Sequence, residues 1–119
     1  MGITKSEALK AVDRERGPVC EASDKIWDQP ETAFQEFHST DVLCELLEKE
    51  GFRVERNLAG IATAFSGTYG SGKPVVGILG EFDALSGLSQ ESESLEKTAL
   101  VDGAPGHGCG HNLLGTGSV

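Results

Sequence analysis

The spacing of apolar residues changes at Gly51, and this change limits what the chain can fold into. Before Gly51, apolar side chains recur every three or four residues, which places them on one face of a helix. After Gly51, Phe52 and Val54 alternate with Arg53 and Glu55, as in a strand with one buried face. Helices followed by strands predict the α/β class, with helices packed on a mixed β-sheet.

Two helices are predicted near the start of the chain. Thr4 followed by Glu7 is a capping-box pattern, which indicates that a helix covers residues 4–16. Gly17-Pro18 then interrupts the apolar stripe, and proline is well suited to a first helical turn. We therefore expect a second helix over 18–28, with a single kinked helix as the alternative.

A third helix is predicted before Gly51. Ser39 or Thr40 can cap its first turn, and Gly51 stands where a helix commonly ends. One face of this segment is apolar, which is typical of a helix packed on a core. That face consists of Val42, Leu43, Leu46 and Leu47.

Strands are predicted in the middle of the chain. After a first strand over 52–55, the alternation in 61–65 indicates a second strand, and the glycine-rich segment 67–72 indicates a turn. Residues 61–78 are therefore expected to form a hairpin. Residues 74–79 are apolar on both faces, as the central strand of a sheet would be.

The last third of the chain is less regular. Residues 89–97 are polar and acidic, so we expect an exposed excursion there. Leu113, Leu114 and Val119 are expected to begin another buried element, and a chain that stops there lacks the polar linker usual at a domain boundary.

Composition narrows the possible functions. The chain has 38% apolar residues, which is a globular composition, and its net charge of −9 argues against nucleic-acid binding, which usually needs a basic surface. Residues 1–10 contain no apolar segment of a signal peptide, and no apolar run is long enough for a membrane span. A cytoplasmic protein with no membrane partner is therefore expected.

The chain has three cysteines, which are widely spaced. An odd number at wide spacing argues against a disulfide framework. Cys20 and Cys44 are expected to act as small buried hydrophobes. Cys109 lies in a different setting, between glycines and histidines.

The densest group of chemically active residues is His107-Gly108-Cys109-Gly110-His111-Asn112. Imidazole and thiolate are good ligands for zinc, manganese or similar divalent ions. The intervening glycines remove side-chain bulk and let the backbone fold tightly around an ion. An ordinary glycine-rich turn or a phosphate-contacting loop would give the same spacing.

A second group, Gly80 to Leu85, follows the apolar segment 74–79. Its acids, Glu81 and Asp83, end a segment expected to be buried, where a carboxylate needs a partner. Asp83 can orient a metal-bound histidine or bind the ion directly. Two solvated acids in a strand-end turn are the alternative.

The sequence GEFDALSGLSQ followed by GHGCGHNLLG resembles the M20 family of metallopeptidases and amidohydrolases. Within that family it is similar to the branch with a Cys-Gly-His metal motif. The resemblance extends upstream through Ile26-Trp27, Pro30-Glu31, Phe34 and Glu36, and covers nearly the whole chain. Asn112 stands where most of the branch has Asp, which matches the aminobenzoyl-glutamate subgroup, and Gly17-Pro18 departs from the family's uninterrupted first helix.

The resemblance implies roles for particular residues. Cys109 and His111 would be two ligands of a site for two divalent ions, manganese or zinc, and Asp83 would orient the site. His107 matches a recurrent histidine without a definite role and is a possible additional ligand. The family's general-base glutamate and its remaining ligands lie downstream of residues 1–119. This chain would then be the N-terminal portion of the catalytic domain, without the dimerising lid domain.

The implied reaction is metal-dependent hydrolysis of an amide bond in N-acyl amino acids or dipeptide-like molecules, with aminobenzoyl-glutamate as lead candidate. The chain alone is expected to be inactive, and the full-length protein to be a homodimer or a hetero-oligomer with a related subunit. Two alternatives remain: a hydrolase with Cys109 as nucleophile beside His107 or His111, and a non-catalytic remnant or metal-binding fragment.

Overall fold

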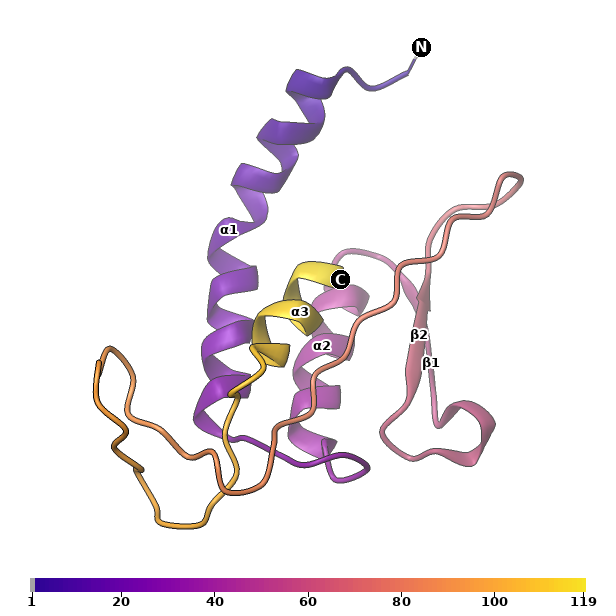
Figure 1. Cartoon of the computed structure of the whole chain (residues 1–119). Coiled ribbons are helices and arrows are strands. Elements are labelled where there is room, and N and C mark those ends of the chain that lie inside the picture. The colour runs from indigo at the N-terminus through magenta and orange to yellow at the C-terminus, as the bar shows by residue number, and fades with distance from the viewer. Residues whose placement is uncertain (1) are drawn as a thin grey trace.

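The computed structural model describes residues 2–119 and contains three helices and a two-stranded sheet in that range (Figure 1). In chain order the elements are α1 (Lys5–Asp28), α2 (Phe37–Lys49), β1 (Arg53–Arg56), a 3₁₀ turn (Leu58–Gly60), β2 (Phe65–Thr68) and α3 (His111–Ser118). α1 contacts α2 and α3, and α2 contacts both strands. The predicted α/β class is therefore confirmed.

α1 is one uninterrupted helix, so the prediction of two helices is wrong and the single-helix alternative is correct. The predicted capping box is present, because Glu7 N donates to Thr4 Oγ1 at 3.3 Å and Thr4 N donates to Glu7 Oε2 at 2.8 Å. Pro18 removes the hydrogen bond that the carbonyl of Arg14 would accept. Arg14 is exposed, so water can hydrate that carbonyl and the helix continues.

Only the last turns of α1 are buried. Ala22, Ser23 and Ile26 lie in the core, whereas Leu9 and Val12 are 56% and 69% exposed. Figure 1 shows the first half of α1 extending away from the rest of the molecule. The part of α1 that matters for packing is therefore its C-terminal half.

α2 begins at Phe37, so the prediction that Ser39 or Thr40 caps it is wrong. The Glu31 carboxylate takes that place, since it accepts from His38 N at 2.9 Å and from Ser39 N at 2.8 Å. A carboxylate at a helix N-terminus satisfies free N–H groups and interacts favourably with the helix dipole. The end of the helix is as predicted, since Gly51 follows it with a φ of +86°.

β1 pairs antiparallel with β2, with Arg53 opposite Thr68 and Arg56 opposite Phe65. The second strand starts later than predicted, because residues 58–60 form the 3₁₀ turn. The predicted hairpin over 61–78 is wrong, since the strand that pairs with β2 precedes it in the chain.

The predicted central strand over 74–79 is also wrong for residues 2–119. Figure 1 shows this segment running back past β2, but no strand is assigned to it. Val75, Val76, Ile78 and Leu79 are between 76% and 89% exposed. A strand that is apolar on both faces needs neighbouring strands and a layer on each face, and this part of the chain meets neither requirement.

α3 buries a different face from the one expected. Leu113, Leu114 and Val119 are 66%, 44% and 38% exposed, whereas Asn112, Gly115 and Thr116 are buried. The buried positions are spaced by three and four residues, so they share the helix face that packs against the rest of the fold. The small core consists of Ala22, Ile26, Leu43, Cys44, Leu47 and Ala84.

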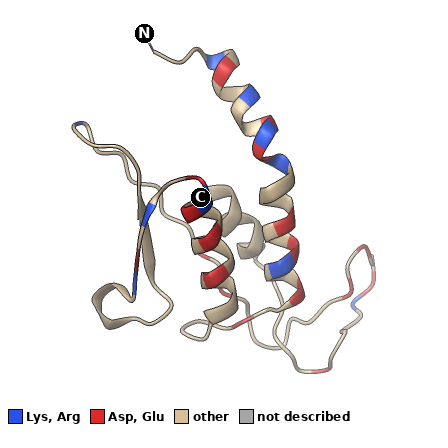
Figure 2. Cartoon of the chain, turned by 180° about the vertical axis from the view of Figure 1, so that it is seen from behind, with Lys and Arg blue, Asp and Glu red and all other residues tan. Residues whose placement is uncertain are grey.

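Charged residues lie mainly on solvent-exposed faces (Figure 2). Asp41, Glu45 and Glu48 line the exposed side of α2, and residues 89–97 belong to a long loop without helix or strand, as predicted. Within residues 2–119, no helix combines the length and apolar character needed to cross a membrane.

All three cysteines are free, in agreement with the predicted lack of disulfides. Cys44 is fully buried, as expected, and burial raises its thiol pKa to about 11. Cys20 is exposed, so its predicted burial is wrong. It lies on the side of α1 that faces away from the core residues Ala22 and Ile26.

Candidate metal site

Three potential ligand side chains meet at the start of α3. His111 has its Nδ1 atom 2.8 Å from Asp83 Oδ1 and its Nε2 atom 3.3 Å from Glu81 Oε2. One ligand atom from each residue lies within 4.8 Å of the other two. The side chains of His111 and Asp83 are 19% and 27% exposed, and that of Glu81 is 64% exposed, so the cluster opens to solvent beside Glu81.

The protons of His111 define the chemistry of this cluster. A neutral imidazole carries one N–H, so it can donate to only one of the two carboxylates. The shorter contact fits a hydrogen bond from Nδ1–H to Asp83. The Nε2 lone pair then faces Glu81, and two acceptors oppose each other unless a cation lies between them. That cation can be a second proton on the ring or a metal ion.

Backbone hydrogen bonds hold the segment that carries Glu81 and Asp83. Ala84 N donates to Glu31 O at 2.7 Å, and Leu85 and Gly106 exchange two hydrogen bonds of 3.0 Å. The segment is therefore tied on one side to the residue that caps α2, and on the other to the loop that leads into α3.

Two glycines let α3 approach this segment closely. A Cβ atom on Gly115 would lie 2.8 Å from Phe82 Cβ, and one on Gly80 would lie 2.7 Å from Ser118 Cβ. Carbon atoms that are not bonded to each other prefer about 3.5–4.0 Å. Glycine at these positions therefore brings His111 within reach of Asp83.

The glycines before Cys109 have a similar role toward a neighbouring loop. A Cβ atom on Gly106 would lie 2.0 Å from the carbonyl oxygen of Leu88, and one on Gly108 would lie 2.5 Å from Leu88 Cδ1. The glycine-rich spacing of the motif thus allows close packing on Leu88. A tight fold around an ion, which the sequence suggested, is not needed to explain Gly106 and Gly108.

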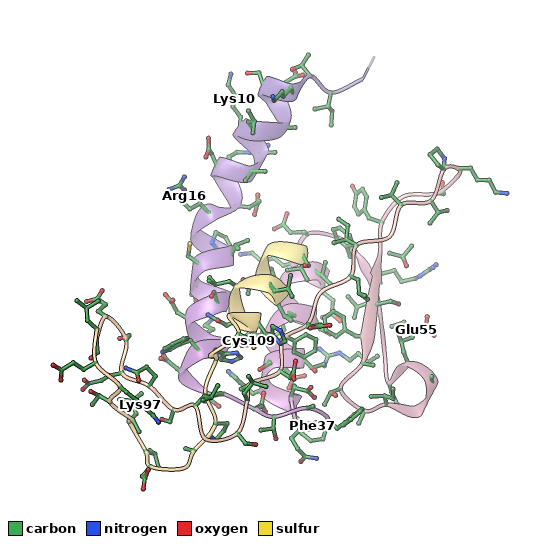
Figure 3. All side chains as sticks on the ribbon, in the orientation of Figure 1. Lys10, Arg16, Phe37, Glu55, Lys97 and Cys109 are labelled. Atoms are coloured by element: carbon green, nitrogen blue, oxygen red, sulfur yellow. The ribbon has the colours of Figure 1, made fainter. Side chains whose placement is uncertain are left out.

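Cys109 lies outside the three-residue cluster. It is exposed in a turn closed by a 3.0 Å hydrogen bond from Gly110 N to His107 O, and Gly110 has a φ of +72°. Figure 3 shows Cys109 where the chain enters α3. The assignment of Cys109 and His111 as metal ligands stays a prediction, with His111 already held between two carboxylates.

His107 is separated from the cluster by its burial against α1. Its side chain belongs to a residue that is 6% exposed, and its Nε2 atom lies 3.2 Å from the carbonyl oxygen of Ile26. Its ring stacks on Trp27 with the centroids 6.4 Å apart. Burial lowers the pKa of His107, so the ring is neutral near pH 7.

Asn112, the second residue of α3, is also attached to α1. Its Nδ2 atom donates to Ser23 Oγ at 2.9 Å, and both residues are buried. The two residues that flank the Cys109–His111 segment, His107 and Asn112, therefore both contact α1.

Glu81 is the participant whose role the sequence did not predict. Sequence reasoning gave a specific role only to Asp83, because the resemblance supplied one for Asp83 alone. The two acids are two residues apart, so in an extended segment they share one face. That spacing could have indicated that both carboxylates reach the same histidine.

Comparison with curated proteins places the chain among hydrolases. It is 49% identical over 106 residues, or 89% of its length, to a component chain of p-aminobenzoyl-glutamate hydrolase from Escherichia coli K12, the one designated B. It is 33% and 32% identical, over 74% of its length, to thermostable carboxypeptidases 1 and 2 of Saccharolobus solfataricus. No family model matches the chain.

The chain spans 22% of the length of each of these relatives. The similarity includes an aminobenzoyl-glutamate hydrolase, as the motifs around Asp83 and His111 predicted. Through these relatives and those motifs, the chain belongs to the M20 family of peptidases and amidohydrolases.

Proposed function

We propose that this chain supplies part of the metal site of an enzyme that hydrolyses amide bonds. The observation that carries the proposal is His111, which is fixed by Asp83 on one ring nitrogen and faces Glu81 with the other. A histidine that binds a metal commonly donates its second N–H to a carboxylate, which fixes the tautomer and the ring orientation. Asp83 is the orienting carboxylate in this reading.

The distance between His111 and Glu81 fits a shared ion. Two ligand atoms that each lie ~2.1 Å from one zinc ion at a tetrahedral angle are ~3.4 Å apart. His111 Nε2 and Glu81 Oε2 are 3.3 Å apart. We therefore propose His111 and Glu81 as ligands of one ion, with Cys109 joining from the adjacent turn as a thiolate.

The residues present fit a divalent ion such as zinc or manganese, because nitrogen, oxygen and sulfur donors are all available. The bound ions would supply Lewis-acid polarisation of the substrate carbonyl and a water of lowered pKa. Asp83 holds the proton of His111 Nδ1 and keeps the ring in place. Glu81, which is open to solvent, lies on the side from which a substrate can approach.

The substrate class follows from the relatives' names and from the motifs. We propose N-acyl amino acids or dipeptide-like amides, with aminobenzoyl-glutamate as lead candidate. We also propose that residues 1–119 are the N-terminal portion of a catalytic domain, whose general-base glutamate and further ligands come from the remaining length of the protein. One relative is named as a subunit, which supports an oligomer, with a related subunit or a second copy.

The geometry gives less support to Cys109 as a nucleophile. Such a cysteine needs a histidine within hydrogen-bond reach to take its proton. His111 has both nitrogens against carboxylates, and the Nε2 of His107 contacts a backbone carbonyl. Within residues 2–119, no hydrogen bond joins Cys109 to either ring.

Metal analysis of a full-length protein that contains this chain tests the proposal. Cys109→Ser, Glu81→Gln and His111→Ala should each lower metal content and aminobenzoyl-glutamate hydrolysis together. His38→Ala is the control, because His38 lies on α2 outside the cluster and should leave both unchanged. Unchanged metal content in the His111→Ala protein would refute the site. The isolated 119-residue chain should show no metal-dependent turnover.

A further inference from the structure

We propose that His107 and Asn112 are positioning residues, which hold the Cys109–His111 segment on α1, and that His107 does not bind the metal. This inference rests on the proposed metal site. It assigns a definite role to a histidine for which the sequence allowed several.

The contact between His107 and α1 identifies the tautomer. The carbonyl oxygen of Ile26 can only accept a hydrogen bond, so His107 Nε2 must carry the proton. Nε2 is therefore a donor with no lone pair free for a metal. Nδ1 is buried without a hydrogen-bond partner, and within residues 2–119 it lies outside the ligand cluster.

The Ile26 carbonyl needs this donor. α1 ends at Asp28, so Ile26 belongs to the last turn, whose carbonyls have no partner within the helix. Ile26 is fully buried, which keeps water from that carbonyl. A buried acceptor left without a donor costs about 1–3 kcal/mol. His107 therefore satisfies a requirement of α1 and fixes its own loop at the same time.

Asn112 forms the second attachment. It donates to Ser23 Oγ at 2.9 Å, and Ser23 and Ile26 are three residues apart on one face of α1. The two attachments lie on either side of the proposed ligands in the sequence. They restrain a segment that contains Gly108 and Gly110 and would otherwise have much conformational freedom.

Restraint of this kind matters for binding, because ligands must be held within about 0.5 Å of their working positions. Loss of a group that orients a ligand typically lowers metal affinity about 10- to 100-fold. We therefore expect weakened metal binding when either attachment is removed, although neither residue touches the ion.

Two substitutions of His107 separate positioning from ligation. Glutamine places an amide N–H the same number of bonds from the backbone as Nε2, so His107→Gln can still donate to Ile26. Asparagine places it at the level of Nδ1, so His107→Asn cannot. Neither side chain offers an imidazole to a metal. Cobalt affinity of the 119-residue chain, followed through its thiolate-to-cobalt absorption, should stay within about threefold for Gln and fall about tenfold or more for Asn.

Ser23→Ala tests the other attachment and should also weaken cobalt binding about tenfold. Thr40→Val is the matched control, because it removes a buried 2.9 Å hydrogen bond, to Thr63 O, away from the loop. It should leave cobalt affinity unchanged. In nitrogen-15 spectra, His107 should keep its Nε2–H tautomer when zinc is added.

The outcomes are distinct. Equal loss of affinity in His107→Gln and His107→Asn, or a zinc-induced shift of His107 Nδ1, would overturn the inference while leaving the metal site in place. An equal loss in Thr40→Val would show that general destabilisation explains the effect, and would also overturn it. Failure of the unsubstituted chain to bind cobalt, with His107 in the Nδ1–H tautomer, would reject both this inference and the proposed function.

Discussion

Replacing Gly106 with alanine should separate the loop before α3 from the segment that carries Asp83. The added Cβ atom would lie 2.0 Å from Leu88 O, 2.5 Å from Leu88 C and 2.9 Å from Ser89 N. These are backbone atoms, which cannot rotate away as the end of a side chain can. The backbone of one of the two loops must therefore move.

The cost has two parts. Overpacking of a well-packed site typically costs about 1–3 kcal/mol. Movement of the loop also weakens the two hydrogen bonds between Leu85 and Gly106, each worth about 0.5–1.5 kcal/mol. The sum is about 2–6 kcal/mol, a large part of the 5–15 kcal/mol typical of a folded domain.

Urea unfolding followed by circular dichroism measures this loss. Gly117→Ala is the control, because a Cβ atom there meets nothing within 4 Å and the residue lies in α3. That substitution should be neutral or stabilise by up to about 1 kcal/mol. The reasoning fails if Gly106→Ala unfolds within about 0.5 kcal/mol of the unsubstituted chain, the usual range for surface substitutions.

Three further predictions follow from the same contacts. In the native chain, Cys20 and Cys109 should react with a thiol reagent while Cys44 reacts only after unfolding, and the free energy of unfolding should fall between pH 9 and 11. The thiol in the unfolded chain loses its proton first, near its ordinary pKa of 9.0, so alkali favours unfolding, by up to about 3 kcal/mol; rapid labelling of all three thiols would contradict this. Glu31→Ala should lower stability in urea by about 1–2 kcal/mol, because two N–H groups of α2 lose their acceptor, and an effect no larger than that of the exposed Glu93→Ala would contradict this. Val76→Lys should reduce self-association in sedimentation experiments, because Val76 is 81% exposed on an unpaired apolar segment; equal association of both chains would exclude that surface.

Local patterns predicted local structure well. The capping box at Thr4 and the helix end at Gly51 were both correct, because each depends on residues within one helical turn. The burial of Cys44 was also correct, since it lies on the apolar face of α2 with Leu43 and Leu47. Contacts within a few residues were therefore readable from the sequence.

Errors arose where partners lie far apart in the chain. The cap of α2 comes from Glu31, five residues before the N-cap residue Glu36, and no capping pattern describes that spacing. The segment 74–79 has the composition of an interior strand, but composition does not say which segment will pair with it. Its side chains remain exposed in residues 2–119.

The candidate site shows the same division. The motifs identified Asp83 and His111, and the structure brings them within hydrogen-bond distance. Alternation within 107–112 suggested that His107, Cys109 and His111 share one side. The turn at Gly110 and the burial of His107 against Trp27 separate them instead. Spacing alone could not predict this, because it depends on where α1 lies.

α1 therefore acts on the site without contributing a ligand. The carbonyl of Ile26 and the hydroxyl of Ser23 lie on its buried face and hold the residues on either side of the proposed ligands. Both belong to the last two turns, where the helix is in contact with the core. A substitution that shifts those turns should move the ligand segment as a unit, whereas the exposed first half of α1, including Val12, can change with little effect on the site.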